Sequence, residues 1–289
     1  MRRRVQGDGP RLLQPNHRLP VGGLRRGRPA LPPVGPERPQ ALTGTVAGTS
    51  CLVVVPARRE STRLPDKLLL AESGRPLLAH TLERCLAAGR AERVVAAVDG
   101  PELAEVARAA GAEAVLTPPE LPSGSDRVQA AVEKLGGAER IVNVQGDEPE
   151  IDPAAIDRLA DALADGAEVA TLAAPFPTGA DPADPAAVKV VRDLAGNALY
   201  FSRSLVPHRR RADGAAPLLH VGVYAYTGAA LAAFAAAAPT PLERAEGLEQ
   251  LRFLERGVPV RVLDWPAAFP GIDTRADYDA FLDRIGTPR

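Results

Sequence analysis

The chain has 289 residues, of which 45 % are apolar and 25 % charged, and its formal net charge is −1. These values are ordinary for a globular protein, and no apolar run approaches the roughly 18 residues of a membrane-spanning helix. The weakly acidic balance argues against a nucleic-acid-binding core. Cys51 and Cys85, the two cysteines, exclude a disulfide framework and are compatible with a reducing, cytoplasmic location.

The first 48 residues differ from the rest in composition. They hold nine arginines against one aspartate and one glutamate, a net charge of +7, and they show no helical or strand period. Such a segment buries too little apolar surface to offset the entropy of ordering. We predict that residues 1–48 are a disordered Arg/Pro-rich extension or foreign to the natural protein; an RNA-binding tail and a targeting peptide are the alternatives.

From residue 50 onward, strand patterns and helix patterns alternate along the chain. Continuous apolar runs predict buried strands, and apolar residues three and four apart predict helices. This alternation predicts an α/β fold with a mostly parallel, mixed sheet sandwiched by helices. The expected strands are 51–55, 93–98, 113–116 and 140–145, and the expected helices are 77–88, 102–110, 126–135 and 153–163.

After about residue 168 strand patterns follow one another with few helices between them. We therefore expect a smaller antiparallel insertion lobe at about 168–230, serving substrate binding or dimerisation, within a single domain over residues 49–289. The expected strands here are 169–175, 188–192, 198–202 and 219–226, followed by a helix at 242–256, a strand at 260–263 and a last helix at 275–285.

Positive charge is concentrated in the loop after the first strand, where Arg58, Arg59, Arg63 and Lys67 fall within about ten residues. Forked arginine donors and the N–H groups of a turn suit phosphate oxygens. The stretch has neither Gly-x-Gly-x-x-Gly nor Gly-Lys-Ser/Thr, so a dinucleotide fold and a P-loop are not indicated. By itself, the loop is also explained as a solvated surface segment.

Acidic residues follow two other predicted turns. Asp147 and Glu148 come directly after the apolar strand that leads into Gln145, and Asp273 follows a Pro-Gly turn ahead of Thr274. Carboxylate oxygens suit Mg²⁺, which commonly binds one or two carboxylates together with substrate phosphates. Each position alone is also explained by turn chemistry, but with the basic loop they predict a site for a nucleoside triphosphate and Mg²⁺.

Seven motifs stand out in chain order between about residues 50 and 285. They are PARRESTRLPDK from Pro56, SGSDR from Ser123, NVQGDEP from Asn143, YFSR from Tyr200, HVGVYAY from His220, LEQLRFLE from Leu248 and GIDT from Gly271. Together they resemble the 3-deoxy-manno-octulosonate cytidylyltransferase family, also called CMP-KDO synthetase. Several consecutive matches of this length are far more specific than an isolated Gly-Asp pair.

The resemblance implies transfer of CMP from CTP to the anomeric hydroxyl of 3-deoxy-manno-octulosonate (KDO), with release of pyrophosphate and Mg²⁺ as cofactor. It also implies a nucleotidyltransferase-like fold and a homodimer. From the charge balance and the apolar runs we expect that the core binds no nucleic acid and no membrane. By motif, Arg58, Lys67, Asp147 and Asp273 would be catalytic, with both aspartates as metal ligands. The remaining positions would be Pro56, Ala57, Arg58, Arg63, Lys67, Ser123, Gly124, Asp126 and Arg127 for CTP, and Gln145, Arg203, His220, Tyr224, Glu249 and Gln250 for the sugar acid.

The chain departs from the family pattern at several positions on the nucleoside side, which bears on base selectivity. Gly100 and Leu121-Pro122 stand where the family usually has histidines, and Ser125 stands where it has Thr. Arg59 replaces a more usual aromatic and is expected to face solvent. The alternatives are CMP activation of another ulosonic acid (amino-KDO or a nonulosonic acid), a non-catalytic nucleotide-binding homologue, and an RNA-binding protein that acts through residues 1–48.

Overall fold

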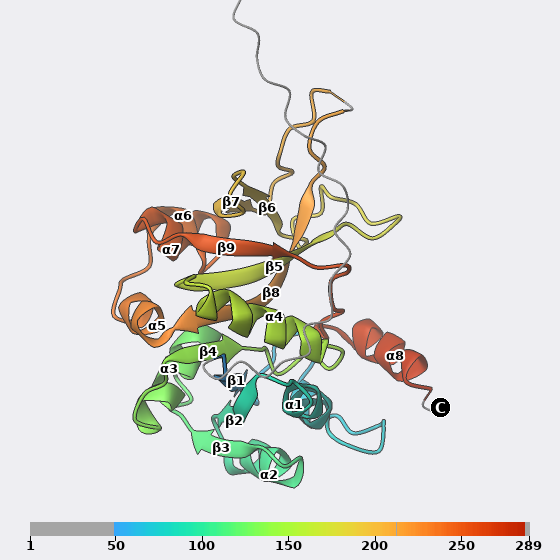
Figure 1. Ribbon diagram of the computed structural model, residues 1–289. Coiled ribbons are helices and arrows are strands. Elements are labelled where there is room, and N and C mark those ends of the chain that lie inside the picture. The colour runs from blue at the N-terminus through green and yellow to red at the C-terminus, as the bar shows by residue number, and fades with distance from the viewer. Residues whose placement is uncertain (1–48, 212, 287–289) are drawn as a thin grey trace, which may run out of the picture. The chain divides into compact units, whose positions relative to one another are not determined.

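The computed structural model describes residues 49–211 and 213–286, so the extension expected at 1–48 lies outside the described residues. The strands of the described part, β1 to β9, form one mixed sheet (Figure 1). Its main path has the order β3-β2-β1-β4-β8-β5-β9. The α/β fold expected from the sequence is therefore confirmed.

The parallel half of the sheet is built around β1 (Cys51–Ala57), which is buried along its whole length. β1 pairs in parallel with β2 (Ala91–Val98) and with β4 (Arg140–Asn143), and β3 (Glu113–Leu116) extends the sheet beyond β2. Because these strands run in the same direction, the loops that follow β1, β2 and β4 meet at one edge of the sheet.

The other half of the sheet contains the antiparallel strands expected after residue 168. β8 (Leu218–Thr227) runs antiparallel between β4 and β5 (Val169–Pro175), and β9 (Val260–Asp264) is parallel to β5. β6 (Lys189–Arg192) and β7 (Ala198–Ser202) form an antiparallel pair off the main path, which joins the sheet through β8. The antiparallel strands are thus continuous with the parallel ones.

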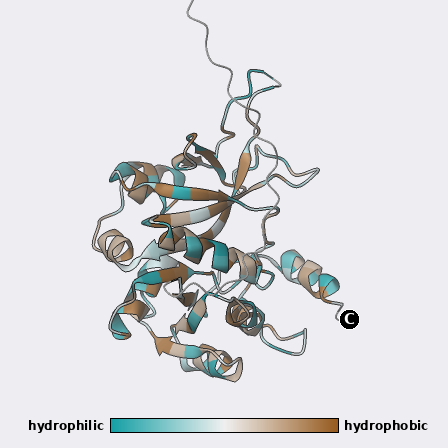
Figure 2. Cartoon of the chain, viewed as in Figure 1, coloured by the Kyte–Doolittle hydropathy of each residue, from teal (hydrophilic) through white to brown (hydrophobic). Residues whose placement is uncertain are grey.

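Successive residues of a strand point to opposite sides of the sheet, so both faces carry apolar side chains. Helices cover both faces. Val53 and Val55 pack in one apolar core, and Leu52 and Val54 pack in the other. Figure 2 shows the apolar residues concentrated on the strands. The first core is covered by α1 (Leu77–Leu86), α2 (Pro101–Ala109), α4 (Pro153–Ala164) and α8 (Arg275–Arg284), and the second by α3 (Gly124–Lys134), α5 (Gly228–Ala235) and α7 (Leu251–Glu255).

The prediction of one continuous helix over residues 242–256 is wrong. α6 (Pro241–Glu246) ends at Gly247, whose φ of +62° is a left-handed conformation that favours glycine, and α7 begins only after the segment that follows. α5 was not expected, because its almost wholly apolar run has no polar face to reveal a helical period. None of the helices in the described ranges has both the length and the apolarity needed to span a bilayer.

His220, near the start of β8, is half-buried in the sheet. Its ring packs edge-on against Phe201 of β7 with the ring centroids 5.1 Å apart, and its Nε2 lies 3.1 Å from Thr171 Oγ1. Burial lowers the pKa of His220 to about 3. The imidazole is therefore neutral at pH 7 and contributes hydrogen bonds without charge.

We expect His220 to make the protein less stable in acid. Below about pH 6.5, His220 of the unfolded chain binds a proton that the folded state accepts only near pH 3. The free energy of unfolding therefore decreases as the pH falls, by up to about 1.4 kcal/mol per pH unit for one such group. Urea unfolding of His220→Gln between about pH 6 and 4 should show a shallower dependence than the wild type.

The matched control is His208→Gln, because His208 lies in an exposed loop of the described chain. This variant should keep the wild-type dependence of unfolding free energy on pH. An unchanged slope in His220→Gln would mean that other groups account for the acid sensitivity.

Candidate functional site

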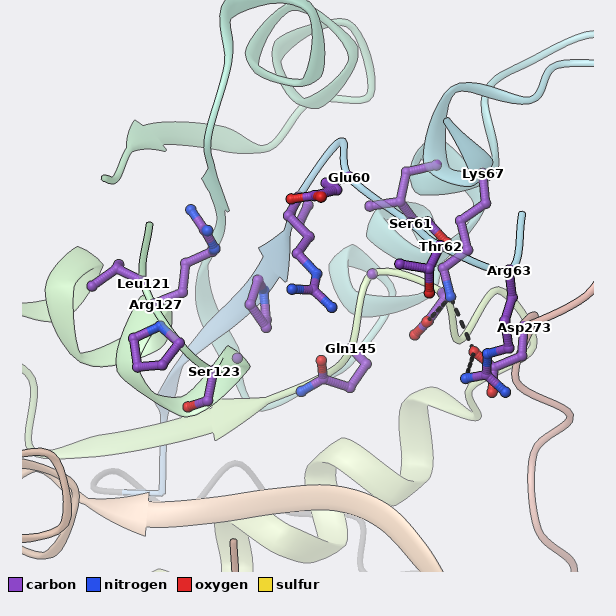
Figure 3. A pocket seen from close by; sticks show the side chains of 18 of the residues that line it. Glu60, Ser61, Thr62, Arg63, Lys67, Leu121, Ser123, Arg127, Gln145 and Asp273 are labelled. Carbon is purple, nitrogen blue, oxygen red and sulfur yellow. Dashed lines mark hydrogen bonds and ion pairs between the residues drawn. The ribbon is translucent and has the colours of Figure 1, made fainter. Parts of the chain in front are cut away.

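A cavity of about 310 Å³ lies at the carboxyl ends of β1 and β4, where the sheet topology brings the loops together (Figure 3). Its walls come from the basic loop after β1, the start of α3, the loop after β4 and the segment before α8. Every residue predicted for CTP lines it except Asp126. The predicted residues around it are Pro56, Ala57, Arg58, Arg63, Lys67, Ser123, Gly124, Arg127, Gln145, Asp147, Glu249 and Asp273.

A second cavity of about 320 Å³ adjoins the first. Gly124, Gln145 and Glu249 line both cavities, so the two share a wall. Five of the six residues predicted for the sugar acid line the second cavity, the exception being Arg203. These five are Gln145, His220, Tyr224, Glu249 and Gln250.

Arg203 lines neither cavity and is instead bound to the backbone around α6. Its guanidinium donates to the carbonyls of Glu246 at 2.7 Å, Pro185 at 3.0 Å and Gly247 at 3.3 Å. Gly247 itself lines the second cavity. In this structure Arg203 therefore positions a wall of that cavity without facing it, and its predicted contact with a sugar carboxylate stays a prediction.

Lys67 is the point where three distant segments meet. The side chain is only 12 % exposed, and its Nζ lies 2.5 Å from Asp147 Oδ2 and 3.2 Å from Asp273 Oδ1. The same Nζ donates to the carbonyl of Ile272 at 2.8 Å. Arg63 also reaches Asp273 Oδ1, at 2.8 Å, and Figure 3 shows these side chains directed toward one another.

Backbone contacts hold the two aspartate-bearing loops together. The Ile272 N–H donates to the carbonyl of Asp147 at 3.0 Å, which joins the loop after β4 to the segment before α8. Thr81 of α1 donates to the carbonyl of Gly146 at 2.9 Å. A Cβ at Gly146 would lie 3.1 Å from the carbonyl oxygen of Pro56, so glycine allows the loops after β1 and β4 to approach closely.

Asp147 and Asp273 provide two carboxylates around one cationic position. In the described ranges no group of three or more His, Cys, Asp or Glu residues is arranged to hold a metal. Two carboxylates are nevertheless what Mg²⁺ needs when substrate phosphates supply further oxygens. The donor chemistry of this pair therefore fits a hard divalent ion that binds with a nucleotide.

Glu148 lies beneath this site. Burial, with the neighbouring carboxylates of Asp147 and Asp273, raises the pKa of Glu148 to about 8. Its Oε2 is buried and has no hydrogen-bond partner among the described residues. A Cβ at Gly271 would lie 3.3 Å from Glu148 Oε1, so the carboxyl packs directly against the segment that carries Asp273.

The start of α3 forms the part of the first cavity that was predicted to bind the nucleoside. The Ser123 hydroxyl caps this helix by accepting from Asp126 N at 3.1 Å and donates to Asp126 Oδ2 at 2.8 Å, so Asp126 orients Ser123 from outside the cavity. Arg127 is buried and donates to Thr117 Oγ1 at 2.6 Å and to the carbonyl of Pro118 at 3.2 Å. Burial lowers the pKa of Arg127, and the residue supports the loop that passes over the cavity.

The basic loop is fastened to the neighbouring strand end. Arg59 N lies 3.1 Å from both carboxylate oxygens of Asp99, and Arg59 Nε lies 2.8 Å from Asp66 Oδ1. The Arg59 side chain is 53 % exposed, so it faces solvent as expected, but it also holds the loop in place. Asp99 does not line the first cavity and instead holds the basic loop from outside it.

Several residues that line the second cavity were not predicted from the sequence, among them Asn143 and Tyr226. Asn143 accepts from Gln145 Nε2 at 3.1 Å and so orients a side chain shared by both cavities. Asn143 is the last residue of β4 and Gln145 follows two residues later, and this two-residue spacing was the signal that could have placed both side chains on one side. Tyr226 is stacked on Tyr224 with the ring centroids 5.8 Å apart. The two residues are two positions apart on β8 and therefore lie on the same face of the sheet.

Burial affects two groups that line the second cavity. Burial raises the pKa of Glu249. The Tyr224 hydroxyl is buried without a hydrogen-bond partner among the described residues. Such a group gains a partner when a polar ligand enters the cavity.

Comparisons with known proteins agree with this geometry. The cytidylyltransferase family model matches residues 52–261. A 3-deoxy-manno-octulosonate cytidylyltransferase of Anaeromyxobacter dehalogenans (strain 2CP-C) is 46 % identical over 230 residues, covering 78 % of this chain and 94 % of the relative. One from Chlorobaculum tepidum is 41 % identical over 247 residues, covering 82 % of this chain and 99 % of the relative.

Solved structures lead to the same fold. A structure of CMP:2-keto-3-deoxy-manno-octonic acid synthetase complexed with CTP matches with a TM-score of 0.78 and 36 % identity, over 82 % of this chain and 98 % of that one. A nucleotidyl transferase from Methanothermobacter matches with a TM-score of 0.53 at 17 % identity, over 82 % of this chain and 98 % of that one, and shares the fold alone. From the family model and the extent of identity to these relatives, the chain belongs to the 3-deoxy-manno-octulosonate cytidylyltransferase family.

Proposed function

We propose that this chain transfers CMP from CTP to the anomeric hydroxyl of KDO, with release of pyrophosphate. The observation that carries the proposal is the convergence of Lys67, Asp147 and Asp273 on one cavity that shares a wall with a second, polar and aromatic cavity. Family membership and the likeness to a synthetase solved with CTP support the same reaction. The homodimer and the cytoplasmic location expected from the sequence stay predictions.

The first cavity suits the triphosphate because its cations come from a short, anchored loop. Arg58, Arg63 and Lys67 line it, and arginine offers forked donors while lysine offers a compact charge. The start of α3, with Ser123 and Gly124, lies at the other end of the cavity and suits the nucleoside. Binding in this pose would aim the α-phosphorus toward the shared wall at Gln145.

The second cavity suits a polyhydroxylated sugar acid. His220 is neutral, and the Tyr224 hydroxyl, Gln145, Gln250 and Glu249 supply hydrogen-bonding groups around it. A hydroxyl group of a sugar would give the Tyr224 hydroxyl the hydrogen-bond partner that it lacks. Because the two cavities adjoin, a sugar held here would present its anomeric hydroxyl to the α-phosphorus at their junction, as an in-line attack requires.

Asp147 and Asp273 would hold Mg²⁺ at the triphosphate end. Bound there, the ion would neutralise phosphate charge and stabilise the charge that develops on the leaving pyrophosphate. Lys67 and Arg63 would bind phosphate oxygens on the same side, since they already face the two aspartates. The protein thus supplies mainly positioning and electrostatic stabilisation, as in phosphoryl transfer generally.

The metal role of Asp147 predicts the behaviour of Asp147→Asn. This variant keeps the shape of the side chain but loses the charge, so pyrophosphate release should fall by at least about 100-fold, in the range for removal of one electrostatic contact to a transition state. The far-ultraviolet circular dichroism should remain that of the wild type. Asp165→Asn, at an exposed helix end, is the matched control and should retain full activity.

The unpartnered hydroxyl of Tyr224 predicts a specific loss in Tyr224→Phe. The KM for the sugar acid should rise about tenfold, the effect of one lost hydrogen bond, while the KM for CTP stays unchanged. The melting temperature should not decrease, because the variant removes a buried polar atom that has no protein partner. Equal weakening of both substrates would place the sugar elsewhere.

The choice among sugar acids is decided by a substrate panel. Pyrophosphate release should be observed with CTP and KDO in the presence of Mg²⁺ and should be absent without Mg²⁺ or with ATP, GTP or UTP. Faster turnover of amino-KDO or a nonulosonic acid would reassign the acceptor. Binding of CTP without turnover of any acceptor would favour a non-catalytic homologue.

A further inference from the structure

Lys67 holds the position that a divalent cation would also occupy. Its single ammonium contacts carboxylate oxygens of Asp147 and Asp273 at 2.5 and 3.2 Å, and Arg63 contacts the same oxygen of Asp273 at 2.8 Å. The charges of the aspartate pair are therefore balanced by two cations of the basic loop (Figure 3). The protein carries its own counter-ion at this site.

An ammonium and a divalent ion that contact the same two carboxylates lie close together. The Lys67 side chain is largely buried, and like charges at close distance repel strongly where water screens them poorly. The charge of Lys67 therefore opposes a metal that binds the two carboxylates, unless the ammonium moves away. Without another anion nearby, the displaced ammonium would lose its ionic partners in a part-buried position, which weakens metal binding.

A nucleotide provides the missing anion. Lys67, Arg63 and Arg58 line the cavity in which the triphosphate is proposed to bind, next to the aspartates. When phosphates enter, Lys67 and Arg63 gain new oxygen partners at the same time as the carboxylates become available. Exchange of partners therefore costs little when nucleotide and metal arrive together, and costs much more when the metal arrives alone.

We propose, resting on the function proposed above, that Lys67 is an internal counter-ion that keeps the affinity for a divalent cation low until a nucleoside triphosphate binds. Metal and nucleotide are then positively coupled through Lys67, and by linkage each raises the affinity for the other by the same factor. As a counter-ion, Lys67 weakens metal binding to the free protein, whereas a residue that only binds phosphate would not affect it. Loss of a mere phosphate ligand would leave metal binding to the free protein unchanged.

The test is Mn²⁺ binding to the full chain without nucleotide, followed by the electron paramagnetic resonance signal of free Mn²⁺, which like Mg²⁺ prefers oxygen ligands. Lys67→Gln should bind Mn²⁺ about tenfold more tightly than the wild type, the effect of removing a competing charge-assisted contact. Lys67→Arg keeps a cation and should stay as weak as the wild type. Lys134→Gln, which removes an exposed lysine bound to the carbonyl of Leu116, is the matched control.

A second titration includes CTP without any sugar acid, with the Mn²⁺–CTP equilibrium measured separately. The wild type should bind Mn²⁺ much more tightly than it does alone, and this gain should shrink by at least about tenfold in Lys67→Gln. Melting temperatures provide a control for folding. Lys67→Gln should melt lower than the wild type without metal, and Mn²⁺ should raise its melting temperature more than that of the wild type.

The outcomes separate this inference from the proposed metal site. Equal Mn²⁺ affinity of wild type and Lys67→Gln without nucleotide, with tight binding of both once CTP is present, would overturn the counter-ion role and leave the metal proposal intact. An absence of Mn²⁺ binding in every variant, with and without CTP, would overturn both, because the aspartate pair would then hold no metal.

Discussion

The balance of charge around Lys67 is the constraint on which the site depends. Asp147 and Asp273 are far apart in the chain, and two carboxylates held close together repel unless a cation lies between them. Lys67 supplies that cation, and the hydrogen bond between Ile272 N and the Asp147 carbonyl fixes the two loops at the same place. The basic loop and the acidic loops therefore stabilise one another.

The sheet topology explains why such a site can form at all. The parallel strands β1 and β4 deliver their loops to one edge, and β8, running antiparallel beside β4, brings His220 and Tyr224 to the adjoining cavity. The two halves of the sheet thus supply different chemistry. The parallel half provides cations, carboxylates and a helix start, whereas the antiparallel half provides aromatic and neutral polar side chains.

Much of this arrangement could be predicted from the sequence, because the strand–helix alternation and the positions of charged loops follow from local pattern. The convergence of Lys67 and Asp147 follows from where the parallel strands β1 and β4 end, whereas Asp273 was assigned to the site from the acidic turn that carries it and through the family resemblance. The break at Gly247 was missed because a glycine within an apolar period resembles a tolerated helical residue. The orientation of Arg203 toward backbone carbonyls could not be predicted, since it depends on how α6 packs against β7.

The wall shared by the two cavities has a consequence for how such enzymes diversify. A Cβ at Gly124 would lie 3.1 Å from Gln145 Oε1, so a side chain there would press against Gln145, which lines both cavities. A substitution in this partition disturbs nucleobase and acceptor recognition together. Evolution toward a different acceptor is therefore freest on the side of the second cavity formed by β8, whose residues do not line the first cavity.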